Sequence, residues 1–177
     1  MARIVQKEDP VLREKAAALA PEDIRSGRIR RIIADMKEAL AREKDGVALA
    51  APQIGVPLRI FIVSGHIFDP EALARDDKSG EYEDLVFINP EIVKESKKKV
   101  PMEEGCLSVR GVYGQVRRAE KVTIDAYNER GEKIRRGASG LLAQIFQHEI
   151  DHLNGILFTD KTKNAQEILS GQNNEDS

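Results

Sequence analysis

The sequence predicts an α+β fold in which small antiparallel sheets pack around a central helix that carries an HExxH motif. Apolar residues recur at helical spacing in two stretches, about residues 24–43 and 139–155. Short apolar or alternating segments lie between these stretches, and two of them are joined by a tight turn. At 177 residues without internal repeats, the chain is expected to form one domain over residues 1–163, followed by a polar tail over 164–177.

The first helix is predicted from Ile29, Ile32, Ile33, Met36 and Leu40, which share one face at helical spacing. This apolar stripe is expected to face the core of the domain.

Two short apolar segments follow, Leu58–Val63 and Leu85–Ile88, and each is predicted to form a strand. Ser64–Asp84, between them, is polar and acidic and contains two glycines and a proline. We interpret it as a long surface excursion and His66, near its start, as an ordinary loop residue.

Pro90–Val100 is predicted to continue as a strand that ends in the basic run Lys97–Lys99, which favours a solvated edge. Val122–Tyr127 alternates between apolar and polar residues, and Asn128–Gly131 supplies a turn into a second strand over Glu132–Arg136. These last two strands are expected to pair as a hairpin.

The second helix is predicted to begin after Ser139, a suitable N-cap, and to end near Gly155. Leu141, His148 and His152 fall on one stripe of this helix. The two histidines are therefore expected to continue its buried face.

Composition excludes several classes of protein. A formal charge of -2, with 33% charged residues, indicates no bulk nucleic-acid-binding surface. No apolar run approaches the roughly 20 residues of a membrane span. Met1–Ala18 lacks the apolar core of a secretory signal and contains early acidic residues, which argues against a transit peptide. A cytoplasmic location is expected.

His148, Glu149 and His152 form the HExxH motif. On a helix this spacing stacks both imidazoles on one face, where they can bind one metal ion while the carboxylate reaches the bound water. The motif predicts a metalloenzyme, and a hydrolytic metal site usually has a third protein ligand. Phe158 stands where the longer HExxHxxGxxH pattern has its third histidine, which excludes that protease family; Glu167 is a downstream candidate.

Cys106, the only cysteine, lies in the sequence EGCLS and is the stronger candidate for the third ligand. An isolated cysteine is commonly a small buried apolar residue. Beside an HExxH helix a ligand role is favoured, because a thiolate and two imidazoles suit Zn(II) or Fe(II) and leave a fourth position open for water.

Three segments together resemble the peptide deformylases: GVALAAPQIG (Gly46–Gly55), EGCLS (Glu104–Ser108) and QHEIDHLNG (Gln147–Gly155). Their order and separation match that family, and the resemblance runs from about residue 4 to 160. It implies a catalytic domain that releases formate from the N-formylmethionine of nascent peptides. It also implies that Cys106 and the two histidines bind the metal, that Glu149 acts as base and acid, and that the Gln53 amide and the Leu107 backbone N–H stabilise the developing oxyanion.

The resemblance further implies a pocket for the methionine side chain and an extended path for the peptide backbone. The matching positions are Gly46, Val47, Ala48, Met102, Glu104, Leu141, Gln144 and Ile145, with the aliphatic side of His148. Three positions depart from the family pattern: Ala48 replaces a usual glycine, and Arg110 and Tyr113 replace a usual proline and a frequent arginine. Altered contacts to the peptide are expected there.

One divalent ion per chain is implied, Fe(II) in the cell, with Zn(II) or Ni(II) as alternatives in purified protein. The implied partners are N-formylmethionyl nascent peptides and, transiently, the ribosome; no membrane and no specific nucleic acid is expected. Two alternatives remain at this point. One is a zincin-like metallopeptidase that uses His148, His152 and Glu167, and the other is a catalytically silent metal-binding or ribosome-docking module.

Overall fold

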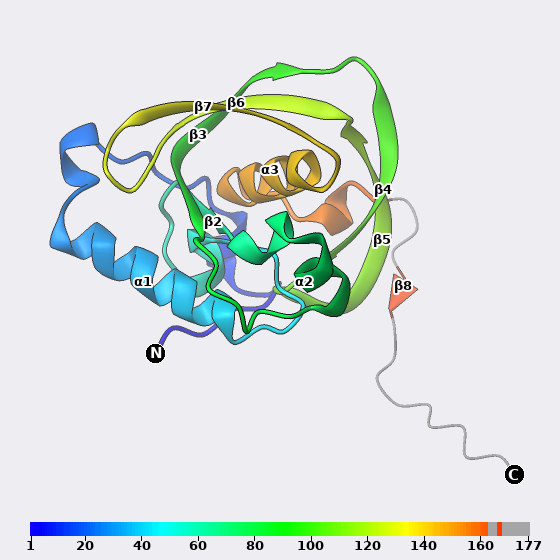
Figure 1. Ribbon diagram of the computed structural model, residues 1–177, viewed down its shortest axis with the longest axis horizontal. Helices are drawn as coiled ribbons and strands as arrows, with labels where there is room; N and C mark the ends of the chain where they lie inside the picture. Colours follow the sequence, from blue (N-terminus) through cyan, green and yellow to red (C-terminus); the bar gives the residue numbers. More distant parts are fainter. Residues whose placement is uncertain (163–165, 168–177) are drawn as a thin grey trace, which may run out of the picture.

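The computed structural model describes residues 1–162 and the backbone of residues 166–167. Over these residues the chain is an α+β protein with small antiparallel sheets, which confirms the predicted class. The larger sheet has the strand order β1-β2-β3-β6-β7, and the smaller has the order β4-β5-β8. Helix α3 lies inside the curve of the strands (Figure 1) and contacts strands of both sheets.

The element bounds are as follows. The strands are β1 (Ala48–Ala50), β2 (Ile60–Val63), β3 (Leu85–Glu95), β4 (Lys99–Cys106), β5 (Val109–Ala119), β6 (Lys121–Tyr127), β7 (Lys133–Ser139) and β8 (Gln166–Glu167). The α-helices are α1 (Gly27–Ala41), α2 (Pro70–Arg75) and α3 (Gly140–Leu153). Short 3₁₀ turns occupy Pro10–Arg13, Pro21–Asp23, Ala51–Ile54, Gly65–Phe68 and Phe158–Asp160.

Helix α1 begins three residues later than predicted, because Pro21–Asp23 forms a separate 3₁₀ turn and Ser26 caps the helix. The Ser26 hydroxyl accepts a hydrogen bond from the Ile29 N–H at 3.3 Å. The predicted apolar stripe is buried, apart from a partly exposed Ile32, and packs with Leu49 and Ile60 of the larger sheet.

Strand β3 continues through Pro90 as predicted, but it ends at Glu95, so the predicted extension to Val100 is wrong. Its pairing with β6 shifts register between Ile88 and Glu91, and the irregularity accommodates a proline that cannot donate to the ladder. Asn89 adopts a left-handed φ of 51° there, and its side chain exchanges two hydrogen bonds with the Leu19 backbone. The basic run therefore lies at the turn into β4 and not at the end of a longer strand.

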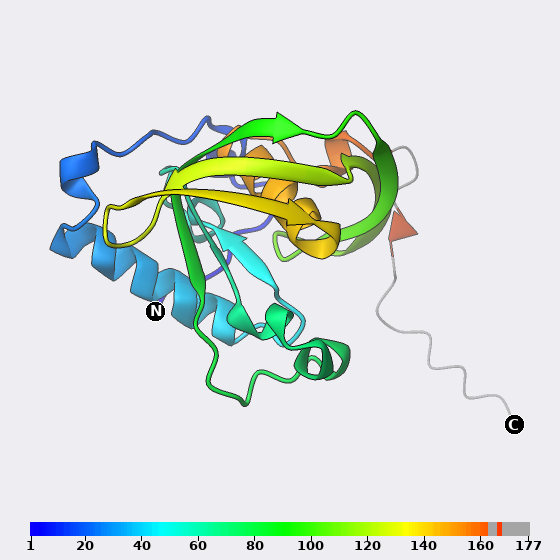
Figure 2. The same cartoon turned by 45° about the horizontal axis from the view of Figure 1, so that its top comes forward.

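The predicted surface excursion, Ser64–Asp84, is more structured than expected (Figure 2). It contains the 3₁₀ turn Gly65–Phe68 and helix α2, which Asp69 caps. His66 is fully buried, and its Nδ1 lies 2.8 Å from the Ser64 hydroxyl. The interpretation of His66 as an ordinary loop residue is therefore corrected.

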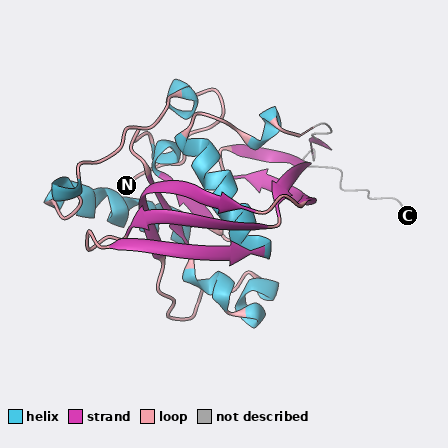
Figure 3. Cartoon of the chain, turned by 90° about the horizontal axis from the view of Figure 1, so that it is seen from above, coloured by secondary structure: helices cyan, strands magenta, loops and turns pink. Residues whose placement is uncertain are grey.

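Helix α3 crosses the face of the larger sheet (Figure 3). Ser139 occupies its N-cap position, although the side chain makes no capping hydrogen bond. Phe146 anchors the helix against Phe61 and Phe87 of the sheet, with a ring separation of 5.0 Å to Phe87. The helix ends where predicted: Gly155 has a φ of 75°, and a Cβ there would lie 2.6 Å from the Arg13 carbonyl oxygen.

None of the described helices has both the length and the apolar character needed to span a membrane. The predicted polar tail, 164–177, lies outside the described residues except for the two backbone positions of β8, which pair with Val112 and Tyr113 of β5.

Candidate active site

A cavity of about 330 Å³ opens between the segment that leads into β1, the β4–β5 hairpin and one face of α3. Most of the residues predicted to contact a peptide line it, namely Gly46, Val47, Ala48, Glu104, Leu141, Gln144 and Ile145. Met102 is not among the lining residues in the described part of the chain. Leu141 is half-exposed at the first turn of α3, so the predicted buried stripe begins one turn later.

Cys106 and His148 line the inner end of this cavity, whereas His152 is buried and is not among the lining residues. One ligand atom from each of the three lies within 4.8 Å of the others. The Cys106 Sγ is 3.3 Å from His152 Nε2. A tetrahedral ion with normal Zn–S and Zn–N bonds would hold such atoms roughly 3.6 Å apart. The donor set therefore fits a single thiolate- and imidazole-bound ion. His66, the remaining histidine, is not part of the cluster.

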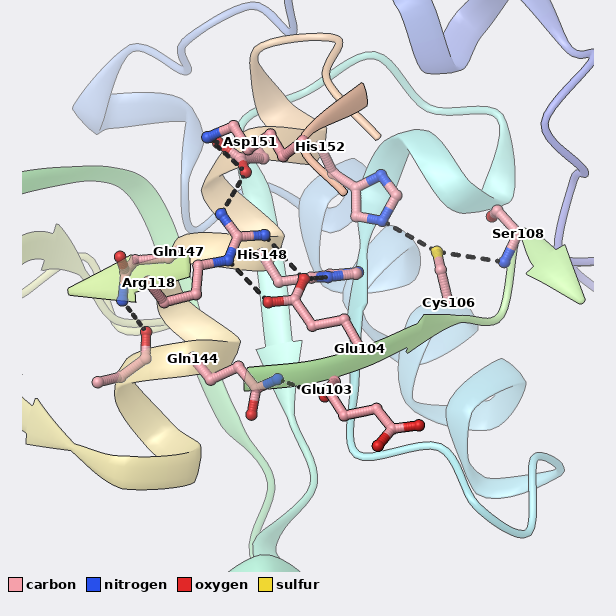
Figure 4. A network of polar contacts seen from close by, with 12 residues as sticks. Glu103, Glu104, Cys106, Ser108, Arg118, Gln144, Gln147, His148, Asp151 and His152 are labelled. Atoms are coloured by element: carbon pink, nitrogen blue, oxygen red, sulfur yellow. Dashed lines mark hydrogen bonds and ion pairs between the residues drawn. The ribbon is translucent and has the colours of Figure 1, made fainter. Parts of the chain in front are cut away.

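Glu104 orients the His148 ring and is itself held by an arginine (Figure 4). Its Oε1 lies 2.9 Å from His148 Nδ1, which leaves Nε2 to face Cys106 and His152. Arg118 donates to both oxygens of Glu104, at 2.7 and 2.8 Å, and to Asp151 on α3 at 2.6 Å. The resulting chain of charges joins β4, β5 and α3 behind the cluster, as outer partners of metal-binding histidines commonly do.

This charge chain is buried, with 2–3% of the Glu104 and Arg118 side chains exposed. Burial raises the pKa of Glu104, but hydrogen bonds from Arg118 and His148 outweigh it and lower the pKa to about 2. Glu104 is therefore ionised at neutral pH. A buried pair of this kind is costly to break, because removing one partner leaves the other charge uncompensated.

Arg118 and Asp151 were not predicted from the sequence as site residues. The sequence of β5 does contain a signal for Arg118. Alternate residues of this strand, Val112, Gly114 and Val116, face inward, and Arg118 continues the same alternation. An arginine on the buried side of a strand requires an acidic partner.

Glu149 is buried beside the cluster and lines the cavity. Its Oε2 has no hydrogen-bond partner among the described residues. Burial raises the pKa of Glu149 to about 7. A carboxyl group with a pKa near neutrality can both accept and release a proton at physiological pH.

Gln53 is 2% exposed, so it is not the surface amide that its residue type alone would suggest. Its Oε1 accepts the Ala50 N–H at 2.9 Å, which turns the amide nitrogen toward the cluster, 3.6 Å from Cys106 Sγ. Leu107 follows Cys106 at the tip of the β4–β5 hairpin, and its carbonyl accepts a hydrogen bond from Gln6 at 3.1 Å. Both predicted oxyanion donors therefore lie beside the cavity.

The cavity is also lined by the three residues that depart from the family pattern, Ala48, Arg110 and Tyr113. Ala48 is 7% exposed and packs within the main core cluster. Arg110 forms a bidentate ion pair with Glu43, at 3.1 and 2.9 Å. The Tyr113 ring covers Gly105, where an added Cβ would lie 2.7 Å from the ring.

An α+β domain that brings a cysteine sulfur, two imidazoles and a buried carboxyl group together beside one cavity has the layout of a metal-dependent hydrolase. The cavity is large enough for a small side chain and its flanking backbone.

Comparison with known proteins makes this class specific: the chain belongs to the polypeptide deformylase family, whose profile matches residues 1–167. It is an enzyme, a metal-dependent hydrolase with deformylase function, which acts on formylated nascent peptides. The family assignment also favours deformylation over the zincin-like peptidase alternative.

Three relatives illustrate the match. A peptide deformylase from Halothermothrix orenii is 46% identical over 154 residues, which cover 86% of this chain and 88% of the relative. The chloroplastic/mitochondrial peptide deformylase 1A of Arabidopsis thaliana is 43% identical, and the match covers 89% of this chain but 60% of the plant protein. A class I type b peptide deformylase from Acinetobacter baumannii, solved with Met-Ala-Ser bound, superposes with a TM-score of 0.77 at 34% identity, covering 89% of this chain and 96% of that one.

Proposed function

We propose that deformylation is carried out at the inner end of the cavity, with α3 as the central helix that carries the catalytic motif. Cys106, His148 and His152 would hold one divalent ion, which would supply Lewis-acid chemistry and lower the pKa of a water bound to it. The observation that carries the proposal is that Cys106, His148 and Glu149 line the same cavity, while the ligand atom of the buried His152 lies within 4.8 Å of those of Cys106 and His148.

Glu149 moves the proton in this proposal. Its buried carboxylate accepts a proton from the attacking water and then passes it to the departing amine. The pKa of about 7, which burial produces, allows both transfers near neutral pH. The neighbouring charges of Glu104 and Arg118 do not exchange protons in this range, because their hydrogen bonds keep both ionised.

The formyl oxygen gains negative charge as water adds to the carbon, and donors already in position stabilise that charge. The Gln53 amide is fixed by the Ala50 N–H and points toward the cluster. The Leu107 N–H lies at the adjoining hairpin tip. We propose these two groups as the donors.

The rest of the cavity accommodates the peptide. Val47, Leu141 and Ile145 provide apolar surface for the methionine side chain. The Gln144 side-chain amide donates a hydrogen bond to the Glu103 carbonyl at 2.8 Å, which links α3 to β4 beside the cavity. Strand β1 pairs only with β2 in the described sheet, so its other edge is available to an extended peptide. The Glu104 carboxylate is hydrogen-bonded to His148. We therefore propose that the main role of Glu104 is to position His148, and that contact with the peptide is secondary.

We propose Fe(II) as the working metal, with Zn(II) or Ni(II) able to replace it, and a reducing cytoplasm as the setting that preserves a thiolate ligand. The predicted ribosome contact remains a prediction. Iron beside a thiolate invites oxidation of both, so air should inactivate an iron preparation faster than a nickel preparation. Equal lifetimes, with Cys106 unmodified in the mass spectrum, would contradict iron.

The direct test is formate release from formyl-Met-Ala-Ser by protein purified without oxygen, with elemental analysis of the same sample. The substrate is the formylated form of the peptide bound by the A. baumannii relative. We expect one equivalent of metal per chain and multiple turnovers. A protein that holds the metal but leaves the formyl peptide intact would support the silent metal-binding alternative.

A further inference from the structure

Two walls of the cavity are joined across its mouth by an ion pair. One wall is formed by residues 45–48, which lead into β1 and which Glu43 precedes by two positions, and the other is the start of β5. Arg110 of β5 lines the cavity and donates two hydrogen bonds to the Glu43 carboxylate, 67 residues away in sequence. The bidentate geometry restricts both position and angle of the two side chains.

Glu43 is fixed from its other side by the segment 64–84. The half-buried Lys78 ammonium donates to the Glu43 carbonyl oxygen at 2.6 Å and to the Leu40 carbonyl oxygen at 3.2 Å, at the C-terminal end of α1. A cation at this end of a helix is favourably placed. The hydrogen bonds from Arg110 lower the pKa of the Glu43 carboxyl, which keeps the pair charged at neutral pH.

The position of this wall affects the groove directly. A Cβ on Gly46 would lie 3.0 Å from the Leu40 side chain and 3.2 Å from the Leu107 side chain. The wall therefore contacts the hairpin tip closely, and a movement of Glu43 would change the space between Gly46 and the start of β5.

We propose that Arg110 and Glu43 form a strap that sets the width of the groove beyond the methionine pocket, and so determines how firmly the residues after formyl-methionine are held. The inference rests on the proposed function, because it concerns the same cavity and the same peptide path. Both residues act as positioning residues: the strap lies at the mouth of the cavity, whereas the reacting groups lie at its inner end.

The test compares a substrate that reaches the strap with one that does not. Formyl-Met-Ala-Ser extends two residues past the methionine, whereas formyl-methionine amide ends at the pocket. Steady-state kinetics would be measured for Arg110→Glu, for Glu43→Arg and for the double variant that exchanges the two charges. Arg110→Ala removes the pair without introducing repulsion. Arg135→Glu is the matched control, because Arg135 forms a similar bidentate pair with Asp125 on the β6–β7 hairpin.

We expect each single variant to raise KM for formyl-Met-Ala-Ser about two- to fivefold, the size of an exposed ion pair, with kcat and the short substrate unaffected. The double variant should restore KM, and Arg135→Glu should not change it. Failure of the double variant to restore KM would overturn the strap, since it would mean that Arg110 contacts the peptide itself. An equal rise in KM for formyl-Met-Ala-Ser and for formyl-methionine amide would also overturn the proposal. Parent protein that hydrolyses neither substrate would instead contradict the proposed function.

Discussion

The ion pairs at the inner end of the cavity are buried, whereas the pair of Arg110 with Glu43 at its mouth is partly exposed, with 21% of the Glu43 side chain accessible. Glu104 and Arg118 have 2–3% of their side-chain surface accessible, but Arg110 at the mouth has 53%. Buried pairs hold a fixed geometry and are expensive to break, while exposed pairs contribute little and adapt easily. The difference indicates that the inner end is preorganised for chemistry and that the mouth adjusts how peptides bind.

The largest expected effect is at the proposed ligands. Cys106→Ser should abolish both stoichiometric metal binding and formate release, because it removes one of three donors. His66→Gln is the matched control, since it alters the one histidine outside the cluster. Elemental analysis measures the outcome, and a Cys106→Ser protein with one equivalent of metal and full activity would refute the ligand assignment.

Glu149→Gln should separate chemistry from metal binding at the same inner end. The amide cannot accept the proton, so kcat should fall by about 10²-fold or more while the metal stays bound. Activity close to that of the parent enzyme would remove Glu149 from the mechanism.

Glu104→Gln tests whether the buried charge chain supports the site. Loss of the negative charge leaves Asp151 as the acidic partner of Arg118 among the described residues, and it weakens the hydrogen bond to His148 Nδ1, because an amide oxygen is a weaker acceptor than a carboxylate. We expect a loss of stability of about 3–5 kcal/mol and a fall in metal affinity of about 10- to 100-fold. Urea unfolding of metal-free protein and competition with a chelator measure the two effects. If Glu104→Gln changed stability and metal affinity as little as Glu43→Gln at the mouth does, the proposed difference between the two regions would be contradicted.

The smallest effect is expected at Ala48, on the wall near the mouth. Glycine there would relieve any crowding of the peptide but would loosen the strand, at about 0.5–1 kcal/mol, and would remove a methyl group from the core cluster. The opposing contributions should keep kcat/KM of Ala48→Gly within about tenfold of the parent, mainly through KM. A collapse of kcat by several orders of magnitude would show that Ala48 positions the reacting groups.

At the inner end, α3 and its two histidines follow from local sequence, whereas the contacts of Arg118 with Glu104 and Asp151 do not. The spacing of His148 and His152 determines that both imidazoles share one face of α3, and Gly155 marks its end because only glycine fits against the Arg13 carbonyl. Cys106 is the only cysteine, so few alternatives compete for the third donor. The apolar stripe of α1 is likewise predicted from residues that are close together in sequence.

The β4–β5 hairpin and strand β1 depend on contacts distant in sequence. Pro101, Gly105 and Gly114 suggest breaks, yet they lie within the long β4–β5 hairpin. Gly105 is required there by the ring of Tyr113, a cross-strand contact that local propensity does not reveal. Strand β1 is built of alanine and leucine, and its pairing with β2 determines its conformation. The ion pair of Arg110 with Glu43 likewise depends on the tertiary fold.

The most direct test of the central claim is X-ray absorption spectroscopy of the protein loaded with one equivalent of Zn(II). The account predicts one sulfur neighbour at about 2.3 Å and two imidazole nitrogens at about 2.0–2.1 Å, with a remaining light neighbour from water. A spectrum without sulfur in the first coordination shell, as two histidines and a glutamate would give, would contradict it.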